Sequence, residues 1–331
     1  MLHLLGDVDA RLAGMWIADA LLARPAPRTV RLRLPLSLRQ AIFSLPTIDA
    51  ATQRFRSARI SLSGTETVLA LLSAHLQQSL GIRIAPESDG TDCDLEIDLT
   101  ENDLTRAVLD DQVLRVPSLP HPAREQHASA HAGDGARLAG LEVKGHAPAL
   151  SLAPDKMAEA RARVRGLAGI LGGPLVAVSP DEGGWGTDKF AALATLLKKK
   201  MGAVLIQLGG PPVPGVTPVF NWTPEVRAAA LSLSAVCVGD DTGWTHVAAA
   251  AGAPVVTVHG DTCPTRFGPA TPRGVAAFNA RGTCNLCIQS KAEKKTRRCL
   301  DCLDPARVAG LAETLAAARW PWDVVERYLT E

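Results

Sequence analysis

Residues 236–265 read VCVGDDTGWTHVAAAAGAPVVTVHGDTCPT and contain the pattern that decides the fold. A short apolar run over 236–239 is followed by a polar turn, by a helix pattern rich in alanine, and by a second apolar run that begins at Pro254. Strand, turn, helix and strand in this order predict a parallel βαβ unit, because parallel strands need a crossover helix. The polar turns of such a unit lie at the carboxyl ends of its strands, where open α/β sheets bind ligands.

The same alternation continues through most of the chain. We expect further strands at 29–38, 59–63, 93–99, 174–178 and 203–208, and further helices at 46–55, 154–170, 187–197 and 224–233. The stretch 117–150 is rich in Pro, His, Gly and Ala and is typical of irregular chain with one short helix. The pattern therefore predicts an α/β protein with doubly wound parallel sheets.

Length and charge limit the function classes. The chain has 331 residues, enough for two domains, and 35 Lys and Arg against 34 Asp and Glu, a net charge of +1 that disfavours a general polyanion binder. The sequence has no run of 18 apolar residues that could span a membrane, and no basic segment precedes an apolar run at the amino terminus, so we expect a cytoplasmic protein.

We place the first domain at 1–155, with an extension at 1–28, and the second at 156–331, ending in a helix over 320–329.

Polar residues gather in three turns that follow predicted strands of the second domain. The turn at 241–243 leads directly into a helix, whose first amides lack partners and are suited to a diphosphate. His246, in the first turn of that helix, would point at the same ligand. Alternatively, Asp241 and Thr242 do no more than cap the helix, and His246 is a partly buried histidine. The candidate ligand-binding residues are Ser179, Glu182, Thr242, Gly243, His246, Gly260, Asp261 and Thr262.

The run 238–269, VGDDTGWTHVAAAAGAPVVTVHGDTCPTRFGP, resembles the nucleotide-sugar motif of the heptosyltransferase family, glycosyltransferase family 9. The similarity extends to 174–197 and, more weakly, to 29–62. The resemblance implies a GT-B fold, in which two Rossmann-like domains face a central cleft and the second domain holds the donor. It also implies inverting transfer of a heptose-like sugar from a nucleotide diphosphate such as ADP-heptose to a glycan or protein acceptor. Asp241 and His246 are then the catalytic candidates.

Three positions depart from the family pattern. The family's aspartate base is replaced by Gln40 in the register anchored on Leu45-Pro46, although another register would supply Asp7. Where the family pattern has a lysine, this sequence has Gly183, and where it has a glutamate, this sequence has Val213. Losing a positioned base typically slows a reaction about 10²–10⁴-fold. A second hypothesis therefore stays open: a catalytically degenerate GT-B pseudoenzyme that binds a sugar nucleotide or a protein partner.

Four cysteines form two C-x-x-C pairs, Cys284 with Cys287 and Cys299 with Cys302. This arrangement predicts a tetrahedral structural metal site, with zinc or iron as alternatives, and four reduced thiols as the other possibility. The resembled family includes protein heptosyltransferases with iron in such a finger. The basic segment 291–298 between the pairs could bind nucleic acid, but neutral total charge and few aromatic residues disfavour this. A solvated loop, or a role in orienting an acidic acceptor or a partner, stays open for this segment. For the protein as a whole, an oligomer or a protein partner also stays open.

Overall fold

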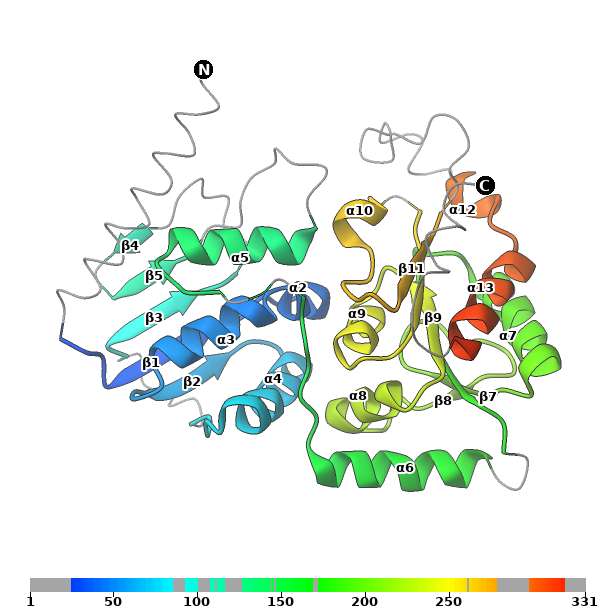
Figure 1. The fold of residues 1–331 in the computed structure, drawn as a ribbon, viewed down its shortest axis with the longest axis horizontal. Helices are drawn as coiled ribbons and strands as arrows, with labels where there is room; N and C mark the ends of the chain where they lie inside the picture. Colours follow the sequence, from blue (N-terminus) through cyan, green and yellow to red (C-terminus); the bar gives the residue numbers. More distant parts are fainter. Residues whose placement is uncertain are drawn as a thin grey trace, which may run out of the picture. The chain divides into compact units, whose positions relative to one another are not determined.

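The computed structural model describes residues 25–85, 93–100, 108–110, 112–116, 127–143, 145, 147–168, 172–260, 262–278 and 298–318. The chain divides into two compact units, Met1–Ser151 and Leu152–Glu331, and each unit has its own sheet (Figure 1). The helix predicted at 320–329 and most of the extension at 1–28 lie outside the described residues. Among the described helices, none is long and apolar enough to cross a membrane.

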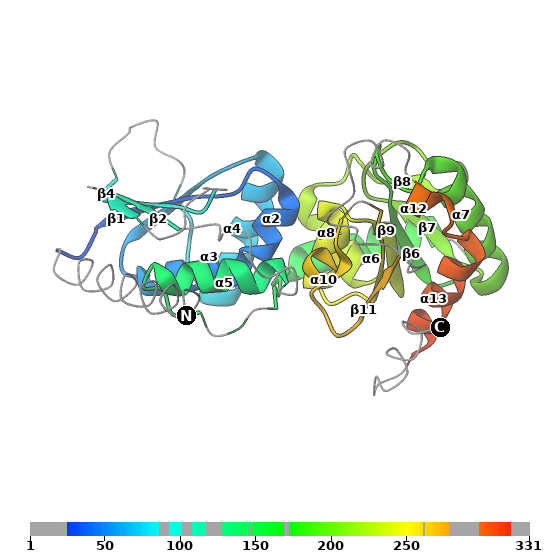
Figure 2. The same cartoon turned by 90° about the horizontal axis from the view of Figure 1, so that it is seen from above.

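The described residues of the first unit form a five-stranded sheet in the order β2-β1-β3-β5-β4. Its described elements are β1 (Thr29–Arg33), α2 (Leu38–Phe43), α3 (Leu45–Arg54), β2 (Arg59–Ser63), α4 (Glu66–Leu80), β3 (Leu95–Asp98), β4 (Val108–Asp110), β5 (Val113–Arg115) and α5 (Ala128–Leu138). The predicted parallel pairing of the first two strands is confirmed, with Thr29 opposite Arg59. The antiparallel pair β4–β5 was not predicted. Helices α3 and α5 lie along one face of the sheet (Figure 2).

In its described residues, the second unit has six parallel strands in the order β11-β10-β9-β6-β7-β8. Its described elements are α6 (Pro154–Ala168), β6 (Leu175–Ser179), α7 (Thr187–Met201), β7 (Val204–Gln207), β8 (Thr217–Pro218), α8 (Pro224–Ser232), β9 (Val236–Asp240), α9 (Gly243–Ala250), β10 (Val255–Val258), α10 (Pro264–Phe267), β11 (Gly274–Ala277), α12 (Arg298–Asp301) and α13 (Pro305–Ala317).

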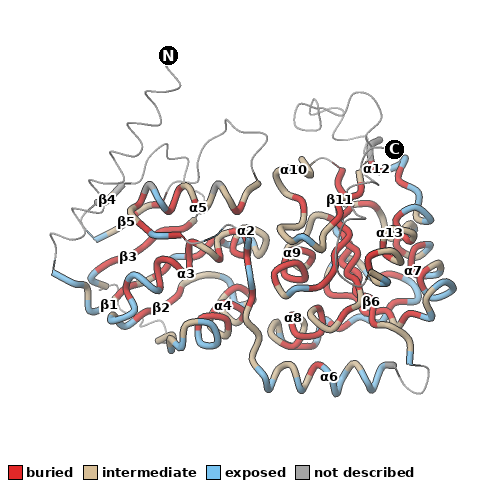
Figure 3. The backbone as a smooth tube through the Cα atoms, viewed as in Figure 1, coloured by how far each residue is buried: buried red, intermediate tan, exposed pale blue. Residues whose placement is uncertain are grey.

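The central strands of the second sheet are buried along their whole length. Every residue of β6, β9 and β10 is buried, because α7 and α13 cover one face of the sheet and α8 and α9 cover the other (Figures 1 and 3). Burial on both faces explains why these strands read as continuous apolar runs and not as alternating ones. The order β10-β9-β6 also brings the ends of three strands, and the polar turns that follow them, to one edge of the sheet.

Candidate functional site

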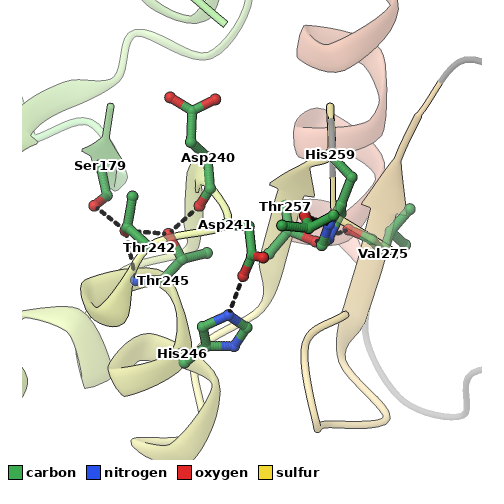
Figure 4. Close-up of polar contacts among 10 residues, drawn as sticks. Ser179, Asp240, Asp241, Thr242, Thr245, His246, Thr257, His259 and Val275 are labelled. Carbon is green, nitrogen blue, oxygen red and sulfur yellow. Dashed lines mark hydrogen bonds and ion pairs between the residues drawn. The ribbon is translucent and has the colours of Figure 1, made fainter. Parts of the chain in front are cut away.

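The polar turns after β6 and β9 are joined by a chain of hydroxyl groups (Figure 4). The Ser179 hydroxyl is 2.7 Å from the Thr242 hydroxyl, which is 3.0 Å from the Thr245 hydroxyl. Thr245 in turn donates to the carbonyl of Asp240 at 2.8 Å. Thr242 is the N-cap of α9, and its side chain accepts from the Thr245 amide. The capping role considered for Thr242 is therefore observed, and its hydroxyl is already engaged by protein groups.

The first two amides of α9 remain open. An α-helix leaves its first N–H groups without partners inside the helix. Within the described parts of the chain, neither the Gly243 nor the Trp244 amide has a protein acceptor, whereas the cap takes up the Thr245 amide. The amino end of α9 thus presents two N–H donors and the positive end of a helix dipole at the carboxyl edge of the sheet. Such an arrangement suits phosphate oxygens.

Asp241 and His246 form a close pair beside this helix end. Nε2 of His246 is 2.7 Å from Oδ1 of Asp241, and the side chains are 1% and 6% exposed (Figure 4). The carboxylate fixes the orientation of the imidazole ring. Both catalytic candidates are thus brought together, but the carboxylate oxygen that faces the ring is occupied by it.

Asp240, the last residue of β9, shapes the turn that follows β6. Its carboxylate accepts hydrogen bonds from the amides of Asp181 and Trp185, at 2.8 and 2.9 Å. Burial raises the pKa of Asp240 from 3.8 to about 7, and the neighbouring Asp181 and Asp241 add to the rise, while the two amides oppose it. Gly184 lies against the carboxylate, where any Cβ would overlap it. Sequence reasoning missed this role, because it considered only the second aspartate of the Asp-Asp pair.

The turn after β10 is held by His259, which is fully buried. Its Nδ1 is 2.9 Å from the Thr262 hydroxyl, and its Nε2 is 2.8 Å from the Thr257 hydroxyl (Figure 4). Gly260 packs so tightly that a Cβ there would approach Leu300 Cδ1 to 2.7 Å. The hydrogen bond between His259 and Thr262 fixes the position of the Thr262 side chain. His259 is the first residue of the polar turn 259–265, one of the three turns that the sequence predicts at the ends of strands.

The structure brings most of the predicted binding residues to the carboxyl edge of the second sheet. Those at this edge are Ser179, Thr242, Gly243, His246, Gly260 and Thr262. Glu182 is exposed on the turn that Asp240 shapes, and Asp261 lies outside the described residues.

The three departures from the family pattern have distinct surroundings. Val213 is 4% exposed in the apolar core, and its amide donates to the side chain of Gln207 at 2.9 Å. Gly183 is exposed on its turn, and Gln40 is half-buried on α2 in the first unit. The alternative base, Asp7, lies outside the described residues.

Most of the predicted metal ligands also lie outside the described residues. These are Cys284, Cys287 and the side chain of Cys299, whereas Cys302 is exposed and forms no disulfide. In the part of the chain that is described, no three His, Cys, Asp or Glu side chains cluster as metal ligands would.

The segment that carries Cys302 is anchored by Lys189. The Lys189 ammonium donates to the carbonyls of Leu300, Asp301 and Leu303, at 2.6, 2.8 and 3.3 Å. The Trp185 indole also donates to the Leu303 carbonyl, at 3.2 Å. Sequence reasoning missed Lys189, whose partners are more than 110 residues away.

Comparison with known proteins agrees with the sequence resemblance. The model of glycosyltransferase family 9 (heptosyltransferase) matches residues 225–297, which include α9, the Asp241–His246 pair and the turn after β10. The resemblance of this region to the heptosyltransferase family is therefore confirmed. No curated protein sequence matches the chain significantly.

Solved structures share the fold at low identity. A family 9 glycosyltransferase from Veillonella parvula is 14% identical with a TM-score of 0.65, covering 87% of this chain and 97% of that one. The iron-containing dodecameric glycosyltransferase TibC from enterotoxigenic E. coli is 17% identical with a TM-score of 0.60, covering 92% and 77%. E. coli heptosyltransferase WaaC with ADP is 17% identical with a TM-score of 0.56, covering 87% and 99%. The chain therefore has the two-domain α/β fold of GT-B heptosyltransferases.

Proposed function

We propose that this protein is a glycosyltransferase that binds a nucleotide-diphosphate sugar in its second unit and transfers the sugar to a glycan or protein acceptor. The observation that carries the proposal is the amino end of α9, where two open amides lie beside the buried Asp241–His246 pair. This end belongs to the segment that the glycosyltransferase family 9 model matches. Sugar transfer is the chemistry common to that family.

In this proposal, the amides of Gly243 and Trp244 donate to the diphosphate oxygens. The helix dipole adds about 0.3–1 kcal/mol of favourable interaction with negative charge. That charge grows on the leaving diphosphate as the bond to the sugar breaks, so these groups stabilise the transition state more than the bound donor. His246, held by Asp241, is placed to hydrogen-bond the leaving group. The Ser179 and Thr242 hydroxyls keep the helix end in place relative to β6.

The donor we favour is ADP-heptose or a close relative, with inversion at the sugar carbon. Support comes from the resemblance of 238–269 to the heptosyltransferase motif and from the similarity in fold to WaaC, which was solved with ADP. The second candidate function is the pseudoenzyme. It is favoured by the neutral residues Gln40, Gly183 and Val213, which stand where the family pattern has an aspartate, a lysine and a glutamate.

Titration calorimetry with ADP tests donor binding, and the Gly243→Pro variant tests the helix end. Proline is favoured at the first position of a helix, and its ring Cδ takes the place of the amide proton. The extended conformation of Thr242, with φ −110° and ψ 163°, accepts a following proline. Since a hydrogen bond to a charged group contributes about 1.5–3 kcal/mol, we expect about a 10–100-fold loss of ADP affinity.

Gly243→Ala, which keeps the amide, is the matched control and should bind ADP nearly as the unaltered chain does. Absence of ADP and ADP-heptose binding to the unaltered chain would refute the proposal. Release of ADP from ADP-heptose on addition of candidate acceptors then separates the enzyme from the pseudoenzyme.

We also propose that Cys284, Cys287, Cys299 and Cys302 hold one structural zinc or iron ion. The proposal rests on the spacing of the two C-x-x-C pairs. Elemental analysis of the purified protein should find about one ion per chain. The ion should be lost in Cys284→Ser and kept in the control Cys93→Ser, whose cysteine lies in the first unit.

A further inference from the structure

Arg227, on α8, lies against a tryptophan at the open end of α9. Its guanidinium carbon is 4.2 Å from the centre of the Trp244 ring, and Nη1 donates to the carbonyl of Leu208 at 3.2 Å. A Cβ at Gly209 would lie 3.3 Å from Cδ1 of the same indole. Arg227, Trp244 and the turn after β7 therefore form one packed cluster, which we call the Arg227 cluster.

The guanidinium of this cluster has no anionic partner among the described side chains. No carboxylate pairs with Arg227, and its buried Nε has no hydrogen-bond acceptor. Glu225, two residues earlier on α8, is not paired with it, since residues two apart on a helix do not face each other. Removing a cation from water is costly unless an anion compensates.

Burial acts on this side chain directly, and it lowers the pKa of Arg227 below its ordinary value. An arginine nevertheless stays protonated in proteins. The cluster thus keeps a half-buried positive charge that has no counter-ion in the part of the chain that the structure describes.

The position of this charge links it to the candidate donor site. Leu208 directly follows β7, and Trp244 is the second residue of α9, so both belong to the carboxyl edge of the sheet. The lysine expected at this edge from the family resemblance is Gly183. Lys189 does not replace it, because its ammonium is bound to three carbonyls of residues 300–303.

We propose that Arg227 is the cation that recognises a phosphate group of the nucleotide donor, with Trp244 holding its guanidinium flat. The proposal deepens the proposed function and rests on it. A planar guanidinium with one N–H fixed on a carbonyl has donors left that match the oxygens of a phosphate. The indole face that carries Arg227 is covered by it, which favours a phosphate over a stacked base as the partner.

Calorimetry with adenosine, AMP, ADP and inorganic pyrophosphate tests this assignment on the full chain. Arg227→Gln should weaken ADP and AMP binding by about 10–100-fold and leave adenosine binding unchanged. Arg227→Lys should have an affinity for ADP and AMP between that of Arg227→Gln and that of the unaltered chain. Arg273→Gln is the matched control. Arg273 also donates from Nη1 to a carbonyl, that of Gly252 at 3.0 Å, and has an unpartnered Nε, but it precedes β11 at the amino edge of the sheet.

The outcomes distinguish the two proposals. Equal ADP affinity in Arg227→Gln and the unaltered chain, or an equal loss of adenosine binding, would overturn the role of Arg227 on phosphate. If the unaltered chain binds pyrophosphate but not ADP, and Arg227→Gln loses pyrophosphate, the anion site stands and the nucleotide donor fails. If it binds neither, both proposals fail. Circular dichroism and thermal melting of Arg227→Gln show whether the variant is folded before any loss is interpreted.

Discussion

At the scale of single residues, Gly184 lies directly against the Asp240 carboxylate, and a methyl group at 184 would overlap Oδ2. The turn must move to admit a side chain, so the two amide hydrogen bonds to Asp240 would be strained. We expect Gly184→Ala to lower the free energy of unfolding by about 1–3 kcal/mol, measured by urea denaturation. Gly166→Ala, where nothing lies within 4 Å of the new Cβ on α6, should be neutral or stabilising. Equal stability of the two variants would contradict this account of the turn.

Asp240 makes stability depend on pH. Its pKa is raised from 3.8 in the unfolded chain to about 7 in the fold, mainly by burial. Between these values the folded chain holds a proton that the unfolded chain has lost, so stability falls as pH rises from about 4 to about 7 and then levels off. The slope contributed by this one group is at most about 1.4 kcal/mol per pH unit.

Asp240→Asn should remove that contribution. The difference in unfolding free energy between Asp240→Asn and the unaltered chain should therefore move in favour of the variant between pH 5 and pH 7.5. Urea denaturation at both values measures this shift. A difference that stays constant with pH would show that Asp240 is already ionised at pH 5.

At the scale of secondary-structure elements, α9 depends on its cap. The Thr242 hydroxyl accepts from the Thr245 amide and also bonds the hydroxyls of Ser179 and Thr245. Thr242→Ala should cost about 1–2 kcal/mol of unfolding free energy, and Thr242→Ser should restore most of it. Calorimetric ADP affinity should follow the same order, because a frayed helix end no longer fixes the two open amides. Full stability of Thr242→Ala would mean that the hydroxyl chain is dispensable.

The elements that the sequence predicted well are those with a strong apolar pattern. The strand at 59–63 matches β2, and the strand at 174–178 is shifted by one residue from β6. The pair β4–β5 was missed, because strands of three residues are too short to show a period. In the site, the cap at Thr242 follows from local sequence. The hydrogen bond from the Trp185 amide to the Asp240 carboxylate joins residues that are 55 positions apart in the sequence. It depends on tertiary packing, which no local pattern reveals.

At the scale of the whole molecule, the chain consists of two compact units, Met1–Ser151 and Leu152–Glu331, with separate sheets. If ADP binds only to the second unit, it should stabilise that unit alone. A ligand at 100 times its Kd adds about 2.7 kcal/mol to the stability of the part that binds it. Tryptophan fluorescence reports mainly on this unit, since Trp16 is the one tryptophan of six in the first.

Urea unfolding followed by fluorescence and by circular dichroism therefore separates the units. With ADP, the fluorescence transition should move to higher urea, while the part of the circular dichroism change that belongs to the first unit stays in place. Gly243→Pro should show a clearly smaller fluorescence shift at the same ADP concentration, because its ADP affinity is expected to be about 10–100-fold lower. A single transition that moves equally in both signals would mean that the two sheets unfold together, and donor binding would then stabilise the entire chain and not the second unit alone.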